Sequence, residues 1–112
     1  MMSNNIEAEN RFAELVAFIR NKAGEHEMPI TRETLIEDDL GVTGDDAAEL
    51  LIELSKKYNF DIAKFKFRNY FYDEPSILDV IGINNRKVKP FAVGYLEKAI
   101  IAGRLDEEVI NS

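Results

Sequence analysis

Apolar residues recur at the spacing of an α-helix in three segments of this chain. The clearest segment predicts a helix over about 44–58 and places five apolar residues on one face: Ala47, Leu50, Leu51, Leu54 and Tyr58. Similar stripes predict a helix over about 5–23 and another over about 91–102. Amphipathic helices must bury their apolar faces against one another, so the sequence predicts an all-α fold, a bundle of three to four helices.

The connections between these helices differ in length. Residues 24–43 are expected to form a long loop that is held to the bundle by isolated apolar side chains: Ile30, Leu35, Ile36 and Leu40. Gly24 and Gly103 are placed to end the first and last helices, since glycine favours the left-handed conformation found there. A short helix is expected over about 76–81, and residues 105–112 are expected to fray.

Residues 60–75 are rich in aromatic side chains and are predicted to be an insertion that packs on the bundle. The alternation from Phe65 to Arg68 fits a strand, while Phe67, Tyr70 and Phe71 also fit a helix. A small strand or hairpin at 60–72 therefore stays open. The interleaved Lys64, Lys66 and Arg68 allow stacking of single-stranded nucleic acid, but the net charge of −7 favours a core cluster with a basic rim.

Composition narrows the functional classes. The 112 residues fit a single domain, 1–112, and contain no cysteine and one histidine, His26, so zinc sites and Ser-His-Asp triads are not expected. The acidic residues lack the spacing of a calcium loop. We therefore expect a protein that is not an enzyme and that binds no metal ion or cofactor. No apolar run reaches bilayer length, which favours a cytoplasmic location. The negative charge favours a partner protein with a basic patch over nucleic acid or membrane.

The start of the second predicted helix concentrates negative charge. From Glu33 through Ser55 the chain has eight acidic residues and no basic one. Thr43 is expected to be the N-cap, with Asp46 in a capping-box position, and Glu53 is expected to pair with Lys57 one turn later. A solvated surface and a partner-binding surface explain this charge equally well, although unrelieved repulsion favours the latter.

The stretch from Leu40 to Leu50, LGVTGDDAAEL, resembles the acyl carrier proteins. In that family a loop ending in Leu-Gly leads to Asp-Ser-Leu-Asp and a long acidic helix. The frame continues without a gap to Ile62, and Tyr58–Ile62 is similar to the residues that follow the family's helix. The last helix, from Phe91 to Leu96, is similar to the family's final helix. The whole chain looks closest to an uncharacterised bacterial branch with the same Gly-Asp-Asp junction.

One position departs from the family pattern. The resemblance aligns Gly44 with the serine that carries 4′-phosphopantetheine, and glycine has no hydroxyl to modify. The family's partner-facing acidic positions match Asp46 and Glu49. We therefore expect an interaction or regulatory module whose docking residues are Asp45, Asp46, Glu49 and Glu53. The alternative is a working acyl or peptidyl carrier modified at an atypical hydroxyl, for which Thr43 is the nearest residue.

Overall fold

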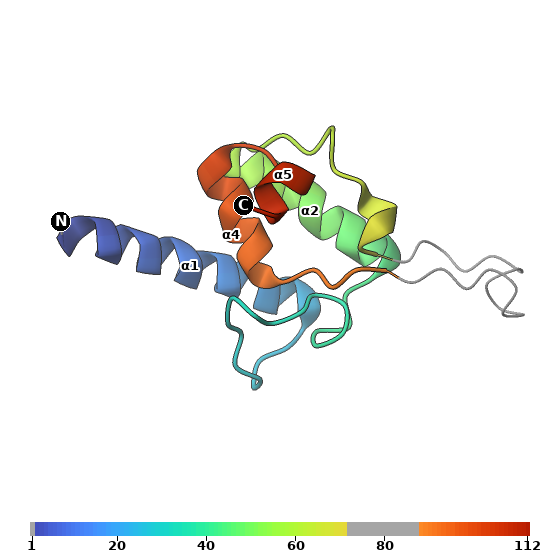
Figure 1. Cartoon of the computed structure of the whole chain (residues 1–112). Helices are drawn as coiled ribbons and strands as arrows, with labels where there is room; N and C mark the ends of the chain where they lie inside the picture. The colour runs from blue at the N-terminus through green and yellow to red at the C-terminus, as the bar shows by residue number, and fades with distance from the viewer. Residues whose placement is uncertain (1, 72–87) are drawn as a thin grey trace, which may run out of the picture.

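The computed structural model of the protein describes residues 2–71 and 88–112, and every regular element within these ranges is a helix. The elements are α1 (Met2–Ala23), α2 (Gly44–Tyr58), the 3-10 helix η1 (Phe67–Asn69), α4 (Val93–Ala102) and α5 (Glu107–Ile110). Figure 1 shows the first half of α1 extending away from the other helices. The prediction of a small all-α bundle is confirmed.

The helices enclose one apolar core. α1 contributes Leu15 and Ile19, both fully buried, and α2 contributes the stripe read from the sequence. α1 begins earlier than the expected residue 5 and ends at Ala23 as expected, where Gly24 has a φ of +70° and donates to the Arg20 carbonyl. Its second half is therefore the part that joins the core.

The long connection between α1 and α2 is held against the start of α4 by backbone hydrogen bonds. The Ile36 amide donates to the Phe91 carbonyl at 2.9 Å, and the Val93 amide donates to the Thr34 carbonyl at 2.8 Å. This extended pairing explains why α4 begins at Val93 instead of near Phe91. Ile30 and Ile36 are buried as expected, so this connection is part of the core rather than a free loop.

Arg32 reinforces this junction from the surface. Its guanidinium makes two charge-assisted hydrogen bonds to the Glu97 carboxylate, at 2.6 and 2.8 Å. The same group lies 4.1 Å from the centre of the Phe12 ring, a cation–π contact. One side chain of the connection thus contacts both α1 and α4.

Gly94 lets the connection approach α4 closely. Its amide donates to the Arg32 carbonyl at 2.9 Å, and a Cβ atom at position 94 would lie 3.0 Å from that oxygen. Gly94→Ala should therefore lower the free energy of unfolding by about 1–3 kcal/mol through overpacking. Glycine-to-alanine changes inside helices normally stabilise by roughly 0.5–1 kcal/mol. Urea denaturation distinguishes destabilisation by overpacking from the usual stabilisation. An unchanged or raised urea midpoint in Gly94→Ala would contradict the close contact.

The aromatic insertion packs into the core around Phe91. The Phe91 ring centre lies 5.2–5.7 Å from the ring centres of Phe65, Tyr70, Phe71 and Tyr95. The strand or hairpin left open at 60–72 is absent from its described part, residues 60–71, which contain η1 and one isolated bridge. Residues 72–75 of the insertion and the short helix expected over 76–81 lie outside the described residues.

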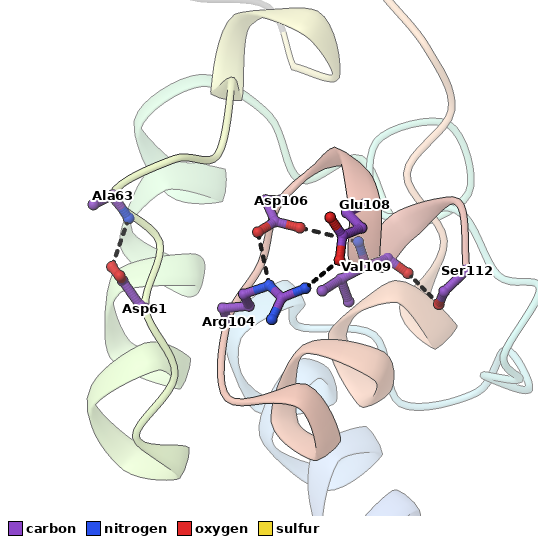
Figure 2. Close-up of polar contacts among 7 residues, drawn as sticks. All are labelled: Asp61, Ala63, Arg104, Asp106, Glu108, Val109 and Ser112. Carbon is purple, nitrogen blue, oxygen red and sulfur yellow. Dashed lines mark hydrogen bonds and ion pairs between the residues drawn. The ribbon is translucent and has the colours of Figure 1, made fainter.

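The C-terminal residues are ordered, so the expectation that they fray was wrong. The Asp106 side chain accepts a hydrogen bond from the Val109 amide and caps α5, as Figure 2 shows. Leu105 and Ile110 are buried. The Asp61 and Leu105 backbones also pair, with the Leu105 amide donating to the Asp61 carbonyl at 2.8 Å. The sequence signal for this helix was the N-cap Asp106, two glutamates in the first turn and then the apolar Val109 and Ile110.

Candidate protein-docking face

The start of α2 has the expected position but not the expected hydrogen bonds. Thr43 is the N-cap residue, yet its side chain makes no capping hydrogen bond, so the predicted capping box with Asp46 was wrong. The Thr43 hydroxyl donates instead to the Glu37 carboxylate. Glu37 lies close because a turn in the connection closes through the Gly41 amide, which donates to the Glu37 carbonyl at 2.9 Å.

Gly44 adopts a backbone conformation that favours glycine. Its φ of +56° lies in the left-handed region, where a residue with a Cβ is destabilised by roughly 1–2 kcal/mol. The glycine thus has a structural role at this helix start. A serine at position 44 would add a hydroxyl at the cost of backbone strain.

Three acidic residues of α2 project from its exposed side: Asp45, Asp46 and Glu49. Within residues 2–71 and 88–112 they make no side-chain hydrogen bond or ion pair with another side chain. Helix geometry places Asp45, Glu49 and Ile52 in one row, at i, i+4 and i+7. The carboxylates of Asp45, Asp46 and Glu49 are therefore accessible to a cation from outside the chain.

Ile52 is a residue of this face that sequence reasoning missed. Its exposed fraction is 44%, and it is one of two large apolar residues exposed on the described surface, with Ile101. The signal was present in the sequence, because Ile52 falls outside the buried stripe of α2 and lies between Glu49 and Glu53. We call Asp45, Asp46, Glu49 and Ile52, together with the adjacent Glu53, the acidic face.

Glu53 differs from the other acidic residues because it is paired within the chain. Lys22 of α1 lies 2.7 Å from one Glu53 oxygen and 2.9 Å from the other. The predicted pair of Glu53 with Lys57 was wrong: the Lys57 ammonium lies 3.2 Å from Glu14 of α1. Because α1 packs beside α2, Glu53 and Lys57 each pair with an oppositely charged side chain of α1 instead of with each other.

The contacts between α1 and α2 also change pKa values. The hydrogen bond to Glu53 raises the pKa of Lys22, and Glu53, Glu49 and Asp46 add electrostatic attraction. Burial and then the hydrogen bond to Glu14 raise the pKa of Tyr58 to about 12. Lys22 of α1 thus attracts three of the eight acidic residues of 33–55, namely Glu53, Glu49 and Asp46, although residues 33–55 themselves contain no basic residue.

The aromatic and basic residues of the insertion occupy different environments. Tyr70 and Phe71 are buried, whereas Lys64, Lys66 and Arg68 are exposed. This arrangement agrees with the prediction of a core cluster bordered by basic residues.

Other site classes gain no support from the described part of the chain. His26 is exposed in the connection after α1. In residues 2–71 and 88–112, no group of three histidine, cysteine, aspartate or glutamate residues is placed to hold a metal ion. None of the helices in these ranges combines the length and the apolar character needed to cross a bilayer.

Comparisons with known proteins identify a family for this chain. Neither the curated proteins nor the solved structures contain a significant match to this chain. A family model described as "Protein of unknown function (DUF1493)" matches residues 7–106, which include α1, α2 and α4 except for the first residues of α1. The chain therefore belongs to the DUF1493 family.

Proposed function

We propose that this protein is a carrier-protein-like interaction module that binds a partner through the acidic face of α2 and carries no phosphopantetheine. The proposal joins the resemblance of 40–62 to the acyl carrier proteins with the exposure of the face. The observation that carries it is the row of Asp45, Glu49 and Ile52, which presents accessible carboxylates beside an exposed apolar side chain. Such a surface fits an apolar site bordered by lysine or arginine.

The conformation of Gly44 supports the absence of an attached arm. A module that uses α2 only for docking needs no hydroxyl at position 44. The positive φ at this position favours glycine. The acidic face can still bind a partner protein, and this binding is the activity that we propose.

A salt titration tests the proposal. The probe is a helical peptide in which a row of leucines is flanked by lysines, here named the Lys/Leu peptide. Its affinity for the protein, measured by isothermal titration calorimetry, should fall as ionic strength rises, because exposed charges are screened beyond roughly 8 Å at physiological salt. Equal affinity at low and high salt would contradict a charge-guided docking face.

The alternative is a carrier modified at Thr43, whose exposed hydroxyl contacts the Glu37 carboxylate, a group able to accept its proton. The intact mass after incubation with a phosphopantetheinyl transferase and coenzyme A distinguishes the two functions. We expect an unchanged mass. An added arm that disappears in Thr43→Val would establish the carrier function instead.

A further inference from the structure

The ion pair between Lys22 and Glu53 connects α1 to one end of the acidic face. Each Glu53 oxygen lies within 2.9 Å of the Lys22 ammonium. We infer that Lys22 is an intramolecular competitor for the acidic face, because its ammonium occupies Glu53 and must be displaced before a cation of the partner can bind that carboxylate. This inference rests on the proposed function and adds a regulatory contact to it.

The position of Lys22 suits this role. Glu53 follows Asp46 and Glu49 at i+7 and i+4, so the carboxylate that Lys22 binds belongs to the same side of α2. Glu49 and Asp46 also attract the Lys22 ammonium. The lysine therefore reduces the negative potential of the face beyond the one residue with which it pairs.

The exposure of the ion pair allows exchange. The side chains of Lys22 and Glu53 are 35% and 39% exposed. The Oε2 atom of Glu53 is itself shielded from solvent, but an ion pair whose two side chains are both partly exposed contributes little to stability and competes with other ions. A lysine or arginine of a binding protein can thus replace Lys22 without opening the apolar core at Leu15 and Ile19.

Lys57 provides a matched control. It also forms an ion pair between α2 and α1, and its side chain is 41% exposed. Its partner is Glu14 of α1, which is not part of the acidic face. Lys22→Met and Lys57→Met therefore each remove one positive charge and one ion pair between the same two helices, but only the first releases a carboxylate of the face.

The experiment measures the affinity of both variants for the Lys/Leu peptide at low ionic strength, after circular dichroism has established that both are folded. Lys22→Met should bind about two- to fivefold more tightly than the unchanged protein, the factor that corresponds to an exposed ion pair. Lys57→Met should keep the original affinity. Equal tightening in both variants would overturn the inference, since it would reflect net charge alone.

A double-mutant cycle with Glu53→Gln supplies a second readout. In the unchanged protein this substitution should weaken binding less than in the Lys22→Met background, because Lys22 already neutralises the Glu53 carboxylate there. In the Lys22→Met background it should remove the gain. Salt-dependent peptide binding without this difference overturns the role of Lys22 alone. Absence of salt-dependent binding in the unchanged protein overturns the proposed function and this inference together.

Discussion

Phe91→Ala should lower the free energy of unfolding by about 3–5 kcal/mol, the usual cost of removing a fully buried aromatic ring. Phe91 is 2% exposed and contacts four other rings. Its carbonyl also accepts the Ile36 amide, so the cavity would open beside the junction of the connection with α4. Urea denaturation followed by far-ultraviolet circular dichroism measures the loss.

Phe67→Ala is the control for this prediction. Phe67 lies in the same aromatic group but is half-buried, and its ring contact in the described structure is with Phe71, at 5.0 Å. Its removal should cost clearly less than that of Phe91. Similar losses for the two variants would show that the cluster has no central residue.

Reversing the charges of Asp45, Asp46 and Glu49 to lysine should slow association with the Lys/Leu peptide by roughly 10–100-fold at low salt. The reason is that complementary charges raise association rates by factors of this order. These side chains are exposed and make no ion pair within the described residues, so the fold should persist. Stopped-flow fluorescence with a labelled peptide measures the rate.

The matched control reverses Glu7, Glu27 and Glu33, which are also exposed but lie outside α2. Both triple variants change the net charge by the same amount. The control should slow association much less, because a local field acts most strongly on a peptide that binds nearby. Equal slowing in both variants would mean that the peptide responds to total charge and not to the acidic face.

The sequence was most informative where structure depends on local periodicity. The range of α2 and the burial of Ala47, Leu50 and Leu54 follow from the apolar stripe. The helix end at Gly103 follows from its left-handed conformation, with a φ of +79°. Such features involve residues within a few turns of each other, so one segment of sequence contains the necessary information.

Contacts between distant segments were not predictable in this way. The Glu53–Lys57 spacing favoured a pair within α2, but Lys22 is nearer once α1 packs beside that helix. The close approach at Gly94 depends on the path of the connection after α1. The candidate docking face was located from sequence through Asp45, Asp46 and Glu49, whereas the pairing of Glu53 and the exposure of Ile52 required the three-dimensional arrangement.

The pairing of the connection with the start of α4 has a consequence for synthesis on the ribosome. The Ile36 amide donates to the Phe91 carbonyl, and the Arg32 guanidinium donates to the Glu97 carboxylate. These contacts join residues from opposite halves of the chain. α1 and α2 emerge first and contain the Lys22–Glu53 pair. The aromatic core closes only after Phe91 has emerged. During translation, apolar residues of α2 such as Leu50 and Leu54 therefore stay exposed until the C-terminal core residues have been synthesised. Chaperones can bind the nascent chain in this period.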